Sequence, residues 1–127
     1  MLVKVLNNSM LHFGFQYTFG LNVLNGKLNT NANIPVGEGG LYFCEIEQLD
    51  AHVYRGDMVC VVEIPKDAIV IPLHLNGNAY FRTDKLVLTN KIYRFDSNKD
   101  VHDLVQLNPN LQDYLNDPCF IRLDKPA

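Results

Sequence analysis

The run Met58-Val-Cys-Val-Val62 decides the fold, because five consecutive apolar residues are typical of a strand covered on both faces. Pro65 ends this stretch shortly afterwards, since proline cannot donate a ladder hydrogen bond. Cys60, in the middle of the run, is expected to be a small buried hydrophobic residue. We therefore place Met58–Ile64 near the centre of a sheet and interpret the rest of the chain around it.

The N-terminal segment predicts two further strands. Leu2–Leu6 is the first. Leu11–Phe19 carries aromatic residues at a spacing of two, which predicts a strand with one buried face, also near the centre of the sheet; these residues are Phe13, Phe15, Tyr17 and Phe19. His12 and Gln16 would then share the opposite, polar face.

The segment of residues 27–40 loses periodicity and is rich in turn residues. It is either a ligand-covering loop or an ordinary surface connection. Leu41–Cys44 follows as a short buried strand. Glu45–Arg55 has apolar residues at helical spacing and is predicted to be a helix that stops at Gly56.

The C-terminal half predicts short strands at Ala68–Ile71, Phe81–Leu88 and Lys91–Phe95, with a turn at Asn76-Gly77. Two helices follow, and Asn108-Pro109 is the expected start of the second. Its inward residues would be Leu111, Tyr114 and Leu115, and Pro118 would stop it. The predicted fold class is α+β, a compact single domain over residues 1–127 with a mixed or antiparallel sheet and short helices.

The composition of the chain argues against several classes of function. A chain of 127 residues has room for one domain, and its net charge of −3 disfavours general nucleic-acid binding. No apolar run approaches the ~18 residues of a membrane span, and the N-terminus lacks a signal peptide, so we expect no membrane association and a cytoplasmic location. Cys44, Cys60 and Cys119 form no CxxC pair, which predicts neither a disulfide framework nor a metal site.

Three residues are candidates for one ligand-binding cleft: His12, Gln16 and Tyr42. An imidazole could hydrogen-bond a ribose, and Tyr42 could stack on a flat base, because Gly39-Gly40 lets a ligand approach closely. The alternative is structural: His12 is then an ordinary surface or core histidine, and Tyr42 belongs to the core.

Arg82 and Asp84 form a second candidate pair. Two residues apart on a strand, they are expected to share a face, with the Gly37–Gly40 loop packed near them as a second wall. They would contact the phosphate or ribose of a ligand; otherwise they are an exposed ion pair. Glu63, at the end of the central run, is either a carboxylate presented to the cleft or an edge charge.

Five motifs in order carry a resemblance to a known group of proteins: Phe13–Tyr17, Gly20–Asn22, Gly39–Phe43, Val62–Pro65 and Arg82–Lys85. Across roughly residues 7–90, the chain resembles the N-terminal domain that precedes repeats in giant-virus (mimivirus-like) ankyrin-repeat proteins. The resemblance implies a viral origin and brings no established activity.

The order of a histidine strand, a glycine-aromatic strand, a short helix and an acidic strand end is also similar to the ADP-ribosyltransferase fold. That resemblance implies NAD as a cofactor, with His12 binding its ribose and Tyr42 stacking on nicotinamide. A later carboxylate would stabilise the oxocarbenium ion. The chain has no late Glu-x-Glu or Gln-x-Glu, which leaves Glu63 and Asp84 as the catalytic candidates.

Three functions follow from these observations. The first is binding of a small nucleotide-like ligand or a host protein without turnover. The second is an ADP-ribosyltransferase-like enzyme that uses NAD. The third is a structural domain for protein interaction. The sequence does not indicate an oligomeric state.

Overall fold

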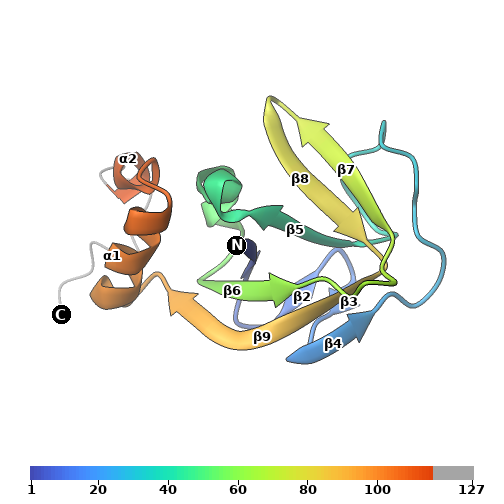
Figure 1. Ribbon diagram of the computed structural model, residues 1–127, viewed down its shortest axis with the longest axis horizontal. Coiled ribbons are helices and arrows are strands. Elements are labelled where there is room, and N and C mark those ends of the chain that lie inside the picture. Colours follow the sequence, from blue (N-terminus) through green and yellow to red (C-terminus); the bar gives the residue numbers. More distant parts are fainter. Residues whose placement is uncertain (116–127) are drawn as a thin grey trace.

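A computed structural model describes residues 1–115, which form one curved antiparallel sheet with short helices at one end (Figure 1). The sheet has seven strands in the order β4-β9-β6-β1-β5-β8-β7. Their bounds are β1 Leu2–Leu6, β4 Gly20–Val23, β5 Leu41–Glu45, β6 Met58–Glu63, β7 Val70–Leu75, β8 Asn78–Thr83 and β9 Lys85–Arg94. The predicted α+β class is confirmed, and every strand pair is antiparallel.

The sheet divides beside its middle strand, β1. β1 pairs with β6 along its whole length, from Leu2 to Leu6, but pairs with β5 only at Leu2 and Val3. Beyond Val3 the two neighbours part, so β5-β8-β7 diverges from β4-β9-β6-β1, as the upper and lower strand groups of Figure 1 show. This parting creates the space in which the candidate site lies.

The core consists of two layers, one on each face of the sheet. One layer packs Val3, Val5 and Cys44 against the short helices and includes Leu49 and Leu104. The other contains Leu6, Tyr17, Phe43, Cys60 and Leu88. Because side chains alternate along a strand, β1 and β5 each contribute to both layers. The expectation that Met58–Ile64 lies near the centre and that Cys60 is buried is confirmed.

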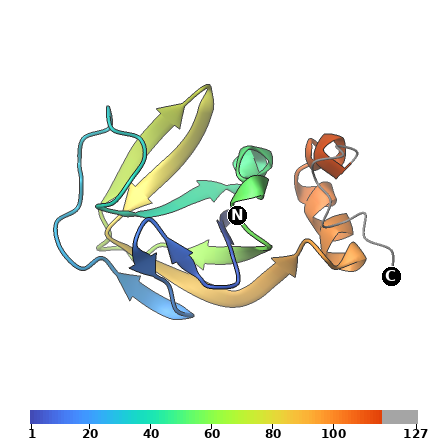
Figure 2. The same ribbon diagram turned by 180° about the vertical axis from the view of Figure 1, so that it is seen from behind.

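The predicted aromatic strand Leu11–Phe19 is wrong. It is a tight hairpin, with β2 Leu11–His12 and β3 Phe15–Gln16 forming a separate two-stranded sheet outside the main one (Figure 2). Phe13 and Gly14, at the turn, have φ values of 47° and 77°. Such left-handed dihedrals at both central residues make a type I′ turn, which reverses the chain and breaks the period-two pattern.

The predicted helix over Glu45–Arg55 consists of two 3₁₀ segments, η1 Ile46–Ala51 and η2 Val53–Arg55, with His52 between them. Gly56 is not a left-handed helix cap, because its φ is −177°. A Cβ at this position would lie 2.2 Å from the Leu6 carbonyl carbon. Close approach of two backbones, not helix termination, therefore requires the glycine.

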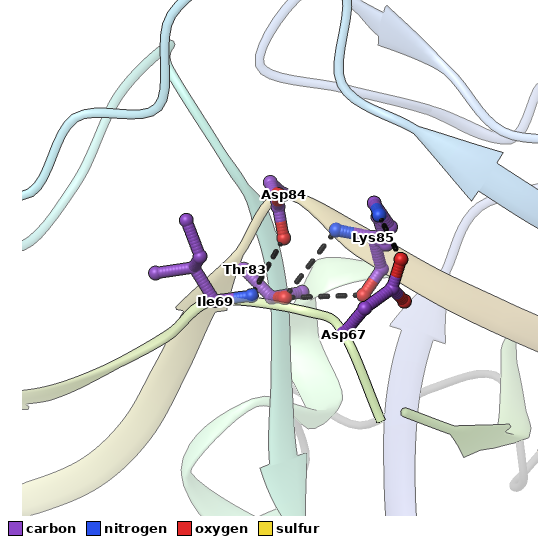
Figure 3. Close-up of polar contacts among 5 residues, drawn as sticks. All are labelled: Asp67, Ile69, Thr83, Asp84 and Lys85. Atoms are coloured by element: carbon purple, nitrogen blue, oxygen red, sulfur yellow. Dashed lines mark hydrogen bonds and ion pairs between the residues drawn. The ribbon is translucent and has the colours of Figure 1, made fainter. Parts of the chain in front are cut away.

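The strands after Pro65 differ from the prediction in their bounds. The Asn76-Gly77 turn is confirmed between β7 and β8, with φ values of 53° and 81°. The predicted break after Leu88 lies instead at Asp84, and β9 is a single strand of 10 residues. Figure 3 shows the reason: Thr83 Oγ1 accepts a hydrogen bond from Lys85 N and donates one to Lys85 O, which bends the chain between β8 and β9.

The helices α1 Asn98–Leu107 and α2 Leu111–Leu115 follow β9. The second helix begins at Leu111, later than the predicted start at Asn108-Pro109. Asn108 is instead the C-terminal cap of α1, and its Oδ1 accepts a hydrogen bond from Asn110 N. Its amide also donates to Ile46 O and Asp50 Oδ1, at 3.0 Å each, and so ties the helices to η1. The predictions for Tyr114, Leu115, Pro118 and Cys119 lie outside the described side chains. None of the helices within residues 1–115 is long and apolar enough to cross a membrane.

Candidate functional site: a basic cavity between two strands

A cavity of about 30 Å³ lies where β1 and β5 part. Its walls come from β1, β5 and β8, from the β2–β3 hairpin, from His52 and η2, and from the loop before β5. Four of the lining residues are basic, Lys4, His12, His52 and Arg55, and four are aromatic, Phe13, Tyr42, Phe43 and Tyr80.

Lys4 is the basic residue of β1, and its side chain is almost completely buried, with 3% exposure. Its Nζ donates a hydrogen bond to the Tyr42 carbonyl at 2.9 Å and lies 3.1 Å from His12 Nδ1. The same nitrogen lies 4.5 Å from the ring centre of Tyr17. Lys4 therefore occupies the space where β5 would have continued its ladder with β1.

Burial and, to a smaller extent, the positive charge of Arg55 together lower the pKa of Lys4 from 10.5 to about 7. Desolvation disfavours the charged ammonium, and none of the contacts of Nζ is a carboxylate. Lys4 was not among the residues expected to form a site, although a lysine inside the otherwise apolar strand Leu2–Leu6 was an available signal.

His12 and His52 share an unusual arrangement. In each ring Nδ1 contacts a basic residue: Lys4 Nζ for His12, and Arg55 Nε at 3.2 Å for His52. In each ring Nε2 is buried and has no hydrogen-bond partner. Burial, together with the neighbouring positive charges, lowers the pKa of His12 to about 3 and that of His52 to about 4. Both imidazoles are therefore neutral near pH 7.

Each neutral ring has one N–H. Arg55 Nε donates to Nδ1 of His52, so the proton of that ring lies on the unpartnered Nε2. When Lys4 donates to Nδ1 of His12, the proton of the His12 ring likewise lies on Nε2. The two histidines thus supply two buried N–H donors with no acceptor. A buried donor without a partner costs about 1–3 kcal/mol, so these atoms are typical of a binding site.

The loop before β5 forms the roof of the cavity through Pro35 and Val36. Two tyrosines of the wall hold it in place: Tyr42 Oη donates to Gly37 O at 2.7 Å, and Tyr80 Oη donates to Pro35 O. The ring of Tyr42 packs edge-on against Phe13, at 5.3 Å between centres. The loop thus covers the cavity, as one of the two interpretations of residues 27–40 expects.

Arg82 does not have the position that the sequence analysis expected. Its side chain is 0% exposed, and Nη1 donates to the carbonyls of Asn29 and Asn31 at 3.0 and 3.3 Å. Nη2 donates to Ile34 O, and Nε donates to Tyr42 Oη at 3.0 Å. The expected exposed ion pair with Asp84 is wrong, because Arg82 is buried and its donors are used by the loop before β5.

Asp84 lies in the bend after β8, where Oδ1 accepts a hydrogen bond from Ile69 N at 2.8 Å (Figure 3). It does not share a wall with Arg82. The expected approach of the Gly37–Gly40 loop to Arg82 is confirmed, since a Cβ at Gly40 would lie 2.1 Å from Arg82 Cγ. The loop and the arginine form a packed structural unit beside the cavity.

The remaining candidates also lie away from the cavity. Gln16 is exposed and donates to Ser9 O at 2.7 Å, so the expected concavity of three residues contains only His12 and Tyr42. Glu63 is exposed at the end of β6. Within residues 1–115, the cavity wall contains no carboxylate. Neither catalytic candidate therefore faces His12 and Tyr42.

Comparison with known proteins places the chain among proteins of giant viruses. It is 30% identical over 93 residues to "Uncharacterized protein R869" of Acanthamoeba polyphaga mimivirus, an alignment that covers 73% of this chain and 67% of that protein. The chain therefore belongs to the family of mimivirus proteins that contains R869. This confirms the giant-virus relationship.

A second relative connects the chain to repeat proteins. "Putative ankyrin repeat protein R868" of the same virus is 36% identical over 64 residues, which is 50% of this chain and 32% of the relative. The chain thus spans about a third of the length of that protein. No family model matches the chain, and no solved structure does, so the resemblance to ADP-ribosyltransferases gains no support.

Proposed function

We propose that this domain binds a small ligand through an anionic group, a carboxylate or a phosphate, in the cavity between β1 and β5, without turnover. The observation that carries the proposal is the pair of unpartnered Nε2 atoms on His12 and His52, in a wall that also contains Lys4 and Arg55.

The electrostatics support an anion. Four basic side chains line the cavity, and no carboxylate among the described residues balances them there. An anion would accept hydrogen bonds from the two imidazoles and would offset the burial and the repulsion by Arg55 that lower the pKa of Lys4. Binding would therefore raise this pKa, and protons would be taken up near pH 7.

The size of the cavity limits the ligand. A volume of about 30 Å³ holds only a few atoms. A whole nucleotide does not fit, so a nucleotide-like ligand would place its phosphate inside and its base outside. Base stacking on Tyr42, as expected from the sequence, is not supported, because its ring is packed against Phe13 and its hydroxyl holds the roof.

Thermal unfolding with small anions tests the proposal. Phosphate, acetate and AMP should raise Tm in a concentration-dependent way, more at pH 6 than at pH 8, whereas adenosine should not. His52→Gln should remove this shift. His74→Gln is the matched control, because His74 is exposed on β7 outside the cavity. Equal shifts in both variants, or no shift with any anion, would refute anion binding in this cavity.

A second candidate function is binding of a protein along the edge strand β4. The alignment with a putative ankyrin repeat protein favours it, and so do three exposed apolar residues, Phe19, Leu21 and Val23, with exposures of 50%, 58% and 46%. An unpaired strand edge can accept a further strand. Leu21→Asp should abolish capture of a host protein, whereas Leu75→Asp on the other edge strand should not.

A further inference from the structure

The amine of Lys4 differs from the amines of Lys85 and Lys99, which form ion pairs. Lys85 lies against the Asp67 carboxylate and Lys99 against that of Asp103, and both ion pairs keep the amine protonated. Lys4 instead has a carbonyl and an imidazole as hydrogen-bond partners and an aromatic ring beside it. An uncharged amine satisfies this environment, because it can donate one N–H to Tyr42 O and the other to His12 Nδ1.

That hydrogen bonding leaves the lone pair of Nζ unused. A desolvated lysine of this kind is a nucleophile toward carbonyl compounds. The pKa of Lys4, lowered to about 7, provides the free amine at neutral pH.

We infer that Lys4 Nζ forms a reversible imine with a small 2-oxo acid, whose carboxylate lies toward His52 and Arg55 while its carbonyl carbon meets the amine. The inference rests on the proposed anion site, because the same basic wall holds the carboxylate. The small cavity favours the smallest members of the class, such as glyoxylate.

The step needs only one proton from solvent in addition to the ligand. The nitrogen lone pair attacks the carbonyl carbon, the C=O π pair moves to oxygen, and one amine proton transfers to that oxygen to give a carbinolamine. A proton from solvent then converts the hydroxyl group to water, the nitrogen lone pair forms the C=N bond as the C–O bond breaks, and the departure of water gives the protonated imine. His12 Nδ1, 3.1 Å from Nζ, is placed to relay the proton. The carboxylate of the ligand neutralises the positive charge of the iminium group.

Reductive trapping tests the inference on the wild-type chain. The protein is incubated with glyoxylate and cyanoborohydride at pH 7, and each amine is examined by peptide mapping. Fragmentation separates Lys4 from the α-amine of Met1, which lies in the same peptide. We expect modification of Lys4 to saturate with glyoxylate and to exceed that of Lys99 by at least about tenfold, since the ion pair with Asp103 keeps the amine of Lys99 protonated.

Two comparisons test whether the site recognises the carboxylate of the ligand. Acetate, which has the carboxylate but no reactive carbonyl, should compete with glyoxylate. His52→Gln should reduce trapping of glyoxylate but leave trapping of formaldehyde, which has no carboxylate, unchanged; His74→Gln should alter neither.

Each outcome separates the inference from the proposed function. Modification of Lys4 no greater than that of Lys99, while anions still raise Tm, overturns the imine and leaves anion binding intact. Modification that acetate does not reduce and His52→Gln does not alter overturns the assignment of a 2-oxo acid. Absence of both trapping and anion-induced shifts refutes the two together.

Discussion

Lys4 and Arg82 are two buried basic residues with different roles. Arg82 has four hydrogen-bond acceptors, and its planar guanidinium matches the carbonyls of the loop before β5. Lys4 has fewer acceptors, and burial lowers its pKa. Arg82 therefore has a structural role and Lys4 a chemical one, although neither pairs with a carboxylate within residues 1–115.

Replacement of Arg82 should destabilise the fold strongly. Arg82→Met leaves three loop carbonyls and Tyr42 Oη without their donor, and we expect a loss of about 3–5 kcal/mol. Arg94→Met on β9 is the matched control and should cost less than about 0.5 kcal/mol, because that residue is exposed. Urea unfolding measures both. A loss below about 1 kcal/mol for Arg82→Met would contradict this assignment.

Lys4 should make stability depend on pH. The folded pKa of Lys4 is about 7 and its ordinary value is 10.5, so between these values the unfolded chain binds more protons than the folded one. The free energy of unfolding should therefore rise by about 2 kcal/mol between pH 7 and pH 9. Lys4→Met should lack this rise.

The rise in stability with pH ends where the cysteine thiols of the unfolded chain begin to ionise. Burial raises the pKa of Cys44 and Cys60 from 9.0 to about 12 and 11, so above pH 9 the unfolded thiols ionise first and stability falls. The free energy of unfolding of the wild type and of Lys4→Met is measured by urea unfolding over pH 7–9. Parallel curves for Lys4→Met and the wild type would show that Lys4 is charged in the folded protein.

At the scale of elements, the parting of β1 and β5 decides where the site forms. The two strands share only two register positions, and the hairpin, His52 with η2, and the loop of residues 27–40 close the gap beyond them. That loop stays close to β5 because Gly40 lies against the aliphatic part of Arg82. The cavity therefore depends on a backbone approach that a side chain at residue 40 would prevent.

Gly40→Ala should cost more than Gly77→Ala. The new Cβ at residue 40 would meet Arg82 Cγ at 2.1 Å, and the arginine is buried among fixed partners. At Gly77 there is open space, and the cost is the backbone strain of a φ of 81°, about 1–2 kcal/mol. Thermal unfolding compares the two variants. A smaller loss of Tm for Gly40→Ala would show that the loop moves aside freely.

At the scale of the whole molecule, the sheet separates two core layers, and each contains one of the two buried thiols that the structure describes. Cys44 lies in the layer that packs on the helices, and Cys60 lies in the other. Because β1 and β5 contribute to both layers, we expect the layers to open together in one cooperative transition.

Thiol labelling in moderate urea tests this expectation. Cys44 and Cys60 should react with a maleimide at the same opening-limited rate, and mass spectrometry of their separate peptides resolves the two. The control is the fully unfolded chain, in which both react freely. Earlier labelling of Cys44 alone would instead show that the helical layer opens by itself.

Local pattern determined a large part of this fold. The apolar run Met58-Val-Cys-Val-Val62, the strand Leu2–Leu6 and the Asn76-Gly77 turn were all identifiable, since each depends on a few neighbouring residues. His12 and Tyr42 were also placed together correctly. The ordered motifs carried the relationship to giant-virus proteins, which the alignment with R869 confirms.

Only the tertiary structure decided the rest. The aromatic spacing of Leu11–Phe19 fits a strand, but the left-handed turn at Phe13-Gly14 overrides it. Arg82 looks like a surface charge until the carbonyls of the distant loop surround it. Lys4, His52 and Arg55 become a site only because β1 and β5 part, and burial then lowers the pKa values of Lys4 and His52. Burial and unmet hydrogen bonds are properties of residues brought together from distant parts of the chain, so no local pattern in the sequence specifies them.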